Sequence, residues 1–481
     1  MVENLKKNWV LILILLVGAF MRLYKIDAYM TFLGDEGRDS IIVRNLLVYA
    51  DPILIGPGTS VGGMYLGPLY YYFMAPFLFL SGFSPVGPAV GVALLGVITI
   101  YLIYLAGSSW FSREAGLISA TLFAISPTVI TYSHSSWNPN IMPFFALLSV
   151  YSIWKVYKEH KYNYLLVTAV SFAFVLQSHY LGVFLAPIIF IYWFLSRVPI
   201  RYNLFSITLF IFLMSPLLIF DIRHNWMNSR ALYKFITVRE EVVSINPLNS
   251  ISRVYPLLMQ VNSSMLTAKT EPLGQIASIS IILFLVLIPF RNKKMLILWF
   301  ASGIIGLSLY KQNIYDHYFG FLFPVPFLLI GVILQKIYES KYRVFGILVF
   351  SILVFVNLLN NPFRNYPNNQ LQRAKNVSSK VLEIAGDKPF NLAVLAERNY
   401  EDGYRYFMEV AGAQVMHADR WDQKTIVDIL MVICEMEESR CDPTHSPKAE
   451  VANFGWSKIE DKWVVDGVII YKLVHNYPIT K

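Results

Sequence analysis

The chain has 481 residues, of which 56% are hydrophobic and 15% are charged, with a formal net charge of +9 and a mean hydropathy of +0.50. A soluble protein would carry about a quarter charged residues, so the composition excludes an ordinary soluble enzyme and indicates a polytopic membrane protein. Nucleic-acid binding is not indicated either, because Lys and Arg cluster in short turns between apolar segments rather than in a basic stripe.

The first apolar run, from Trp9 to Tyr24, follows Lys6 and Lys7 and has the outline of a signal peptide. No small-residue cleavage site follows it, whereas a long apolar chain does. We therefore expect a retained first membrane helix.

Six turns rich in Lys and Arg separate the apolar segments. By the positive-inside rule they face the cytoplasm, which places the N-terminus inside and the C-terminus outside. These turns are "ENLKKN", "SSWFSREA", "KVYKEHKYN", "SRVPIRYN", "FRNKKM" and "QKIYESKYR".

This alternation fits about eleven membrane-spanning helices. The stretch "LGPLYYYFMAPFLFLSG", residues 66–82, is not counted, because a full span there would move every later turn to the other side. Pro68 and Pro76 interrupt it, so we expect a juxtamembrane or re-entrant element. The predicted spans begin near residues 9, 86, 115, 140, 164, 181, 203, 275, 295, 318 and 343.

The predicted non-cytoplasmic face then collects two long loops, about 25–85 and 221–274, with short turns near Asn138 and His179 and a tail from about Asn360. Ionisable residues outside the basic turns converge on this face. That convergence is the first indication of function.

The C-terminal tail, from about Asn360, has the sequence pattern of a soluble domain rather than of membrane helices. "NLAVLAERNYEDGYRYFMEVAGA" predicts a buried strand, a turn and an amphipathic helix, and "TIVDILMVICE" and "WVVDGVIIYKLV" predict further strands. We expect an α-helical membrane domain at 1–359, a linker at 360–387 and a small extracytoplasmic α/β domain at 388–481.

Both cysteines, Cys434 and Cys441, lie in the α/β domain within "CEMEESRC". A disulfide between them is feasible in an oxidising exterior, and two unpaired thiols are the alternative. No CxxC or HExxH spacing indicates a metal site.

The most unusual stretch of the predicted outer face is "TFLGDEGRDS", residues 31–40, which places Asp35 and Glu36 after the first helix. Gly34 and Gly37 flank the pair and permit a tight turn that can aim both carboxylates at the bilayer surface. A hydrated loop without chemistry is the alternative. The other polar residues on this face favour a functional role.

Four further stretches carry polar residues at helix ends, and each also has a structural interpretation. "YSHSSWNPN" can be a helix start capped by Asn, "LQSHYLG" an interfacial turn, "FDIRHN" an Asp–Arg pair closing a helix, and "YKQNIYDHY" a polar loop beside an aromatic belt. The candidate site residues in them are His134, Asn138, Gln177, His179, Arg223, His224, Lys311, His317 and Tyr318.

A reaction on an amphiphile needs such groups beside apolar helices. A sugar carried on a polyprenyl phosphate is such an amphiphile, because its polyprenyl chain is apolar and its sugar-phosphate head is polar. A carboxylate can take the proton of an attacking hydroxyl, and a cation beside the leaving phosphate stabilises its growing charge. Arg suits phosphate because its planar fork offers two parallel hydrogen bonds.

These residues resemble the GT-C superfamily of membrane glycosyltransferases, in particular the protein O-mannosyltransferases and lipid A aminoarabinose transferases (glycosyltransferase family 39, PMT-like). The resemblance covers roughly residues 15 to 340. It rests on "MRLYKID", "GDEGRDSIIVRNLL", "GPLYYYFMAPFLFLSGFSP", "AGLISATLFAISPTVITYSHSSWNPN" and "HYFGFLFPVPFLLIG".

The resemblance implies a GT-C fold with juxtamembrane helices in the first outer loop. It also implies an inverting transfer of a hexose or pentose to a hydroxyl on the non-cytoplasmic face of the plasma membrane, with Asp35 as catalytic base and Glu36 beside it. Asn138 stands where many relatives carry an acid, so a divalent metal cofactor is not favoured. The C-terminal domain is not the repeat domain of eukaryotic O-mannosyltransferases and gives no support for a protein acceptor.

Two other function classes stay open. A transporter or flippase of lipid-linked sugars would carry ionisable residues at mid-bilayer in matching halves, whereas here the charges lie at helix ends and no repeat is present. A non-catalytic envelope assembly protein is the second. The expected partners are a polyprenyl-phosphate-sugar donor, a hydroxyl acceptor (lipid, glycan or protein) and membrane lipids, without nucleic acid.

Overall fold

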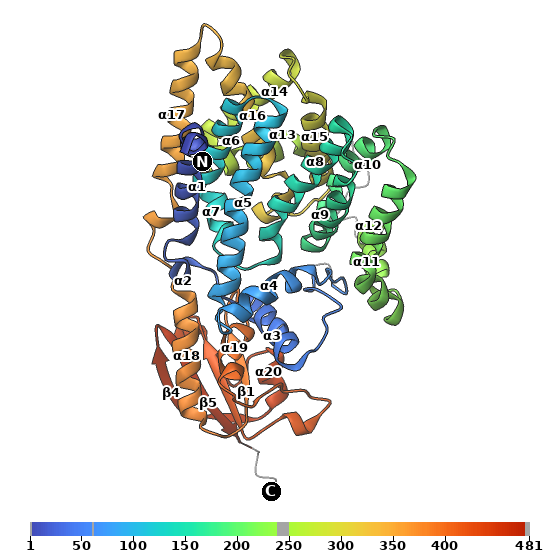
Figure 1. Cartoon of the computed structure of the whole chain (residues 1–481). Helices are drawn as coiled ribbons and strands as arrows, with labels where there is room; N and C mark the ends of the chain where they lie inside the picture. The colour runs from blue at the N-terminus through green and yellow to red at the C-terminus, as the bar shows by residue number, and fades with distance from the viewer. Residues whose placement is uncertain (1, 60–61, 238–249, 477–481) are drawn as a thin grey trace. The chain divides into compact units, whose positions relative to one another are not determined.

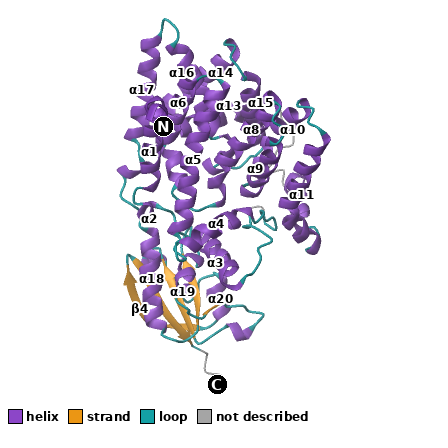
Figure 2. Cartoon of the chain, in the orientation of Figure 1, coloured by secondary structure: helices purple, strands orange, loops and turns teal. Residues whose placement is uncertain are grey.

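The computed structural model describes residues 2–59, 62–237 and 250–476. Helices dominate, and one mixed sheet forms near the C-terminus (Figures 1 and 2). The chain packs as two compact units. The first, here the helical unit, comprises Met1–Tyr24, Pro52–Phe77 and Gly87–Tyr366, and the second, here the mixed unit, comprises Lys25–Asp51, Leu78–Val86 and Pro367–Lys481.

The helical unit consists of apolar helices joined by short turns. Its α-helices are α1 (Val2–Leu23), α5 (Val86–Trp110), α6 (Arg113–Ile125), α7 (Pro127–Ser133), α8 (Met142–Glu159), α9 (Tyr164–Ser178), α10 (Ala186–Leu195), α11 (Ile200–Arg223), α12 (Met227–Thr237), α13 (Ile251–Leu266), α14 (Glu271–Leu287), α15 (Lys293–Ser308), α16 (Pro324–Tyr338) and α17 (Arg343–Leu359). Short 3-10 helices are η1 (Asn138–Ile141), η2 (Tyr180–Leu185), η4 (Asp316–Leu322) and η5 (Pro362–Arg364).

Within the described residues, α5 and α11 are each long and apolar enough to cross a membrane. Three bent pairs raise that number to at most five: α6 with α7 (63°), α13 with α14 (110°) and η4 with α16 (56°). Every predicted span start lies close to the start of an apolar helix or bent pair, but the count of eleven spans stays a prediction. The stretch predicted as juxtamembrane forms the short helix α4 (Leu69–Leu80), with Pro76 inside it.

The prediction of a second long loop at 221–274 is wrong in part, because helices α12 and α13 lie within this range. Residues 238–249 of the predicted loop fall outside the described residues. In α13, Leu257, Val261 and Met265 are buried at four-residue spacing, which is the apolar stripe of a packed helix. Pro256 and a run of polar residues obscured this stripe. Asn262 shows how they are accommodated, since its side chain donates to Ser278 Oγ at 3.0 Å.

Where the helices break, side chains donate hydrogen bonds to the backbone carbonyl groups that would otherwise lack a partner. Pro127 prevents α6 from continuing and leaves carbonyls unpaired. The fully buried Arg22 of α1 donates to Ala124 O (2.9 Å) and Phe123 O (3.2 Å), and Ser126 Oγ donates to Met265 O (2.9 Å). An apolar helical core tolerates such breaks only when partners of this kind are present.

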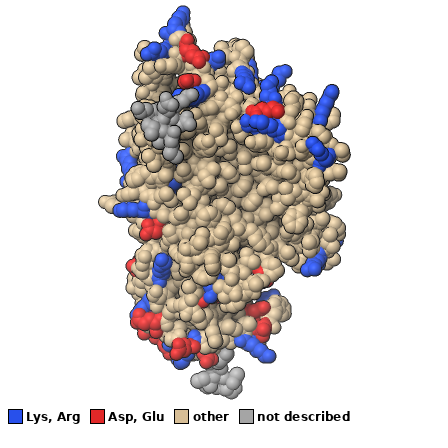
Figure 3. Space-filling view, in the orientation of Figure 1, with Lys and Arg blue, Asp and Glu red and all other residues tan. Residues whose placement is uncertain are grey.

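Charged side chains are unevenly distributed over the face of the helical unit that Figure 3 draws. Lys and Arg gather mainly at the end that holds the turn between α16 and α17, while a broad uncharged band covers the middle of the helices (Figure 3). This is the distribution expected of membrane-embedded helices with basic connecting turns.

The mixed unit is built on a five-stranded sheet with strand order β2-β1-β3-β5-β4. The strands are β1 (Phe390–Leu395), β2 (Val415–Met416), β3 (Ile429–Cys434), β4 (Ser457–Val465) and β5 (Val468–His475). β1 pairs in parallel with β2 and β3, and β5 is antiparallel to β3 and β4. The predicted C-terminal sheet domain is thereby confirmed.

Helices cover the sheet on both faces. Every residue of β1 and β3 is buried, as expected of strands packed from both sides. On one face, Val451 and Phe454 of α20 (Ala449–Phe454) pack against alternate residues of β1, β3 and β5. The other helices of the unit are α2 (Ile26–Tyr29), α3 (Gly34–Tyr49), α18 (Gln370–Ala385), α19 (Asp402–Val410) and the 3-10 turns η6 (Gln423–Thr425) and η7 (Glu438–Arg440).

The segment predicted as a linker, 360–387, contains α18. This helix buries Leu371, Val377 and Val381 along one side and contacts α19, β4 and β5. Its sequence, "QLQRAKNVSSKVLEIA", is polar on the opposite side, which gave it the composition of a linker.

The glycines beside Asp35 serve helix packing rather than a tight turn. Gly34 begins α3, so the predicted loop conformation is wrong at this point. α3 packs against α19, and a Cβ on Gly37 would lie 2.3 Å from the backbone of Asp402. Only a residue without a side chain fits between these two backbones.

We expect Gly37→Ala to lower the free energy of unfolding by about 1–3 kcal/mol, because the added methyl group forces α3 away from α19. Gly58→Ala is a matched control, since its methyl group would meet Tyr65 only at 3.6 Å. Thermal unfolding of the full chain in detergent measures both variants. Equal stability of the two would contradict the packing role of Gly37.

Candidate functional site

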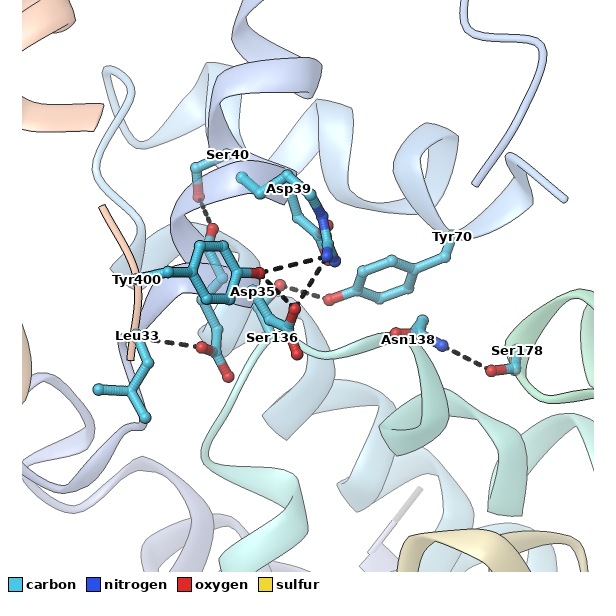
Figure 4. Close-up of polar contacts among 11 residues, drawn as sticks. Leu33, Asp35, Asp39, Ser40, Tyr70, Ser136, Asn138, Ser178 and Tyr400 are labelled. Atoms are coloured by element: carbon cyan, nitrogen blue, oxygen red, sulfur yellow. Dashed lines mark hydrogen bonds and ion pairs between the residues drawn. The ribbon is translucent and has the colours of Figure 1, made fainter. Parts of the chain in front are cut away.

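Asp35 is the accessible carboxylate of the first-loop acidic group. It lies in the first turn of α3 with 43% of its side chain exposed, whereas Asp39, one turn later, is fully buried. Asp35 Oδ1 accepts a hydrogen bond from Arg38 Nη1 (2.8 Å). It also accepts one from the hydroxyl of Tyr400 (2.5 Å), as Figure 4 shows. A carboxylate held by two donors and open to solvent on its remaining side can contact a substrate.

Arg38 is itself fixed between two acids. Its guanidinium donates to Asp35 and, through Nη2 and Nε, to Asp39 Oδ1 at 2.7 and 3.0 Å. The buried Asp39 therefore orients Arg38, and Arg38 orients Asp35. Charge-assisted pairs of this kind are the stronger hydrogen bonds of proteins.

Glu36 differs from its neighbour in both exposure and partners. It is buried, and its Oε2 accepts the backbone N–H of Leu33 at 3.0 Å, which closes the N-terminus of α3. Burial raises the pKa of Glu36 from its ordinary value to about 7. The Glu36 carboxyl thus stabilises the helix turn that carries Asp35.

The loop that follows β1, residues 396–401, completes the surroundings of Asp35. Asn399 Oδ1 accepts the backbone N–H of Gly34 (2.9 Å), and the next residue supplies the hydroxyl to Asp35. Burial raises the pKa of Tyr400 above its ordinary range, so this hydroxyl stays protonated and donates. Sequence reasoning missed both residues. The available signal was a polar run, "AERNYEDG", directly after a buried strand, where α/β sheets place their ligands.

In the helical unit, the structure brings three predicted residues together. His317 and Tyr318 of η4 lie with ring centroids 4.6 Å apart, and His179 lies 6.2 Å from His317 and 5.1 Å from Tyr318. Trp137 packs on His317 at 4.6 Å. Two imidazoles and a phenol hydroxyl therefore share one aromatic cluster, here the His179–His317 cluster.

Three other predicted residues hold the backbone in place. Gln177 is buried, accepts Leu69 N–H (3.2 Å) and donates to Leu213 O (2.9 Å), so it ties α9 to α11 and to the start of α4. Asn138 donates to Ser178 O (2.7 Å) (Figure 4), and the ring of His134 is bound to Ile130 O (2.8 Å). Figure 4 also shows the neighbouring Tyr70–Ser136 hydroxyl pair, at 2.6 Å.

Arg223 and His224 lie exposed at the C-terminal end of α11. Among the described residues, no hydrogen bond or ion pair joins Arg223 to Asp221, so the alternative of an Asp–Arg helix closure is wrong. Asp221 instead accepts the backbone N–H groups of Asn228 (2.7 Å) and Ser229 (3.2 Å) and caps α12. The exposed Arg223 side chain takes no part in this cap.

The loop before η4 carries Lys311, which is exposed. α13 holds this loop, because Gln260 donates to Ile314 O (2.7 Å) and Arg253 donates to Tyr310 O. Asp316 pairs with Lys269 (2.7 Å) and accepts from Ser264 Oγ (3.1 Å). The loop that positions Lys311 and His317 is therefore fixed at several points.

The described residues contain no group of three or more His, Cys, Asp or Glu side chains that could hold a metal ion. Cys434 and Cys441 form a disulfide with Cα atoms 6.2 Å apart, which decides between the two states that the sequence left open.

The sequence model for dolichyl-phosphate-mannose-protein mannosyltransferase matches residues 66–220, and no curated protein sequence matches the chain. ArnT from Cupriavidus metallidurans bound to undecaprenyl phosphate superimposes over 97% of this chain and 98% of its own, with TM-score 0.66 and 11% identity. The resemblance to PMT-like GT-C glycosyltransferases is confirmed. The matched segment includes His134, Asn138, Gln177 and His179 and leaves out Asp35 and Arg223.

Two further structures show the same fold. ArnT in the apo state matches with TM-score 0.61 and 12% identity over 98% of each chain. The archaeal oligosaccharyltransferase AglB from Archaeoglobus fulgidus, in complex with an inhibitory peptide and a dolichol-phosphate, matches with TM-score 0.54 and 13% identity. That alignment covers 89% of this chain and 70% of AglB. The fold of this chain is therefore the one shared by ArnT and AglB.

The raised pKa of Glu36 predicts a pH-dependent stability. The folded state binds this proton more tightly than the unfolded chain, so the free energy of unfolding falls as the pH rises from about 4.5 to about 7, by about 3 kcal/mol. We expect Glu36→Gln to remove this part of the pH dependence, because the amide keeps an acceptor for Leu33 N–H and cannot ionise. Asp402, whose pKa burial raises to about 6, and Glu409, whose pKa burial also raises, contribute further slope of the same sign.

Unfolding of the full chain at pH 5 and pH 8 tests this expectation. Glu383→Gln is the control, since Glu383 is exposed on α18. An undiminished pH dependence in the Glu36→Gln variant would show that the buried carboxyl does not control it.

Proposed function

We propose that the chain transfers a sugar from a polyprenyl-phosphate donor to a hydroxyl acceptor, with inversion at the anomeric carbon and with Asp35 as the general base. The observation that carries this proposal is the half-exposed Asp35 carboxylate, held by Arg38 and Tyr400. The fold and the matched family of mannosyltransferases support the reaction class.

In this mechanism the acceptor hydroxyl approaches the open side of Asp35. The hydroxyl proton passes to the carboxylate as the acceptor oxygen forms a bond to the anomeric carbon. The bond between that carbon and the phosphate oxygen breaks, and its electron pair leaves with the polyprenyl phosphate. Arg38 and Tyr400 hold Asp35 in the geometry that this proton transfer needs.

The donor phosphate requires cations or hydrogen-bond donors where negative charge develops. Arg223, His224 and Lys311 supply exposed groups of this kind, and the His179–His317 cluster supplies two imidazoles with the hydroxyl of Tyr318. ArnT and AglB were each solved with a polyprenyl phosphate, which supports the same donor class for this chain. An apolar cavity of about 120 Å³ between α9, α10 and α11, lined by Phe172 and Trp193 among others, suits part of the lipid tail.

The Cys434–Cys441 disulfide supports a non-cytoplasmic location for the mixed unit, because such bonds persist outside the reducing cytosol. Asp35 belongs to the same unit. The proposed reaction therefore takes place on the outer face of the plasma membrane, with the N-terminus in the cytoplasm.

We expect Asp35→Asn to lower sugar transfer by about 10²–10⁴-fold, because the amide keeps the hydrogen bonds of Arg38 or Tyr400 but cannot take a proton. The assay follows a labelled sugar from synthetic undecaprenyl or dolichyl phosphate into water-soluble or membrane acceptors. Asp51→Asn, an exposed acid of the same unit, is the control.

Full transfer by Asp35→Asn would remove the general-base role. Movement of the labelled lipid across the bilayer without any transfer would instead favour a transporter. Donor binding by the wild type without turnover would favour an assembly protein.

We expect Arg223→Ala to weaken binding of the donor about 10–100-fold, through loss of a charge-assisted contact with phosphate. Arg201→Ala is the matched control, because Arg201 lies at the other end of α11, about 33 Å away along the helix. Displacement of a fluorescent polyprenyl phosphate from the purified protein measures both. An unchanged dissociation constant in Arg223→Ala would exclude the phosphate role.

A further inference from the structure

The mixed unit contains a polar cavity of about 500 Å³ that the proposed mechanism does not use. It opens at the carboxyl ends of β1 and β3, which are neighbouring parallel strands. Its walls are the loop after β1, the loop after β3, the N-terminal part of α18 and Leu33. Ligands of open α/β sheets bind outside the carboxyl ends of such strands, and the volume lies within the usual range of ligand sites.

Charged side chains of both signs line the cavity, and two of them have no partner in the part of the chain that the structure describes. Arg440 pairs with Glu397 at 2.8 Å, and Glu435 accepts from Asn399 (2.5 Å) and the hydroxyl of Tyr404 (2.6 Å). The side chains of Arg398 and Glu437 have no hydrogen-bond or ion-pair partner among the described residues, and both are exposed at the cavity.

The walls are fixed before any ligand arrives. The Cys434–Cys441 disulfide closes the loop that carries Glu437 and Arg440. On the opposite wall, Asn399 bonds to Gly34 N–H and to Glu435, which joins the loop after β1 to the loop after β3. A preorganised site loses less conformational entropy on binding than a mobile one.

Two residues of the cavity lining are close in sequence to Asp35 and to its partner Tyr400. Asn399 and Leu33 line the cavity, while Tyr400, next to Asn399, donates to Asp35, and Leu33 precedes Asp35 by two residues. A ligand in the cavity therefore contacts the two chain segments that also carry and hold the carboxylate assigned as base in the proposed mechanism.

We propose that this cavity is the acceptor site and that it binds an anionic saccharide; this inference rests on the proposed function and names its acceptor class. Arg398 binds the phosphate or carboxylate of the saccharide through its planar fork. Glu437 accepts hydrogen bonds from sugar hydroxyls. A peptide acceptor fits less well, because peptides use free strand edges or apolar pockets, and most of the lining residues are charged or polar.

Direct binding to the full-length protein in detergent tests the site without turnover. The probes are glucose 6-phosphate and glucuronate, each of which carries both an anionic group and sugar hydroxyls. Glucose, which has only the hydroxyls, and inorganic phosphate, which has only the charge, are the comparison probes. Titration calorimetry reports each dissociation constant. We expect both anionic saccharides to bind at least tenfold more tightly than either single-feature probe. Arg398→Ala is expected to weaken them tenfold or more, and Glu437→Gln to weaken them while leaving inorganic phosphate unchanged.

Arg420→Ala is the matched control, because Arg420 is exposed on another loop of the same unit and is not part of the cavity lining. Since Arg398 has no partner among the described residues, Arg398→Ala is also expected to unfold at the wild-type temperature. Equal binding of inorganic phosphate and glucose 6-phosphate, or wild-type binding by Arg398→Ala, would overturn the saccharide site. Displacement of the saccharides by an acidic peptide at lower concentration would assign the cavity to a peptide and overturn it as well.

A second measurement separates this inference from the proposed function. With a labelled polyprenyl-phosphate sugar present, we expect the wild type to extend glucose 6-phosphate or glucuronate by one sugar, detected by mass spectrometry. Asp35→Asn is expected to bind these probes as the wild type does and to transfer nothing. Binding without extension, in a protein that still transfers sugar to membrane acceptors, would overturn the acceptor assignment and leave the transferase proposal standing.

Discussion

The contact between the start of α3 and the loop after β1 determines the geometry around Asp35. Three interactions make it: the Tyr400 hydroxyl on Asp35, Asn399 on the Gly34 N–H, and the backbone approach of Gly37 to Asp402. Each uses a different kind of force, namely a charged hydrogen bond, a helix N-terminal cap and steric fit. Together they join a segment near the N-terminus to the C-terminal sheet and leave only one carboxylate of the acidic group open to solvent.

A second constraint acts in the helical unit, where backbone N–H and C=O groups need hydrogen-bond partners in the absence of water. The chain meets it with single polar side chains at helix breaks: Arg22 on the end of α6, Ser126 on α13, and Gln177 between α9 and α11. These residues are of the same chemical types as residues that bind ligands. Only their hydrogen-bond partners in the structure show whether such a residue supports the backbone or is open to a ligand. Gln177 and Asn138 are engaged with backbone, whereas Arg223 at the end of α11 is exposed.

Hydropathy and turn chemistry predicted much of the fold from the sequence. The helix starts and the C-terminal strands follow from local pattern. Local pattern could not find α13, whose apolar stripe is masked by Pro256 and polar residues, or α18, whose buried side shows only in contact with α19 and the sheet. It also identified Asp35 and Glu36 without distinguishing them, since exposure is set by packing. Tyr400 and Asn399 escaped notice because their importance lies in a partner far away in the chain.

That distance has a consequence for biosynthesis. Asp35 and Tyr400 are 365 residues apart in sequence, and most of the helical unit lies between them. At translation speeds of about 5–20 residues per second, α3 leaves the ribosome roughly 20 to 70 seconds before the loop that completes its surroundings. Throughout that interval α3 lacks its contacts with α19 and with the loop after β1. The surroundings of Asp35 are therefore completed only after the C-terminal sheet of the chain has been synthesised.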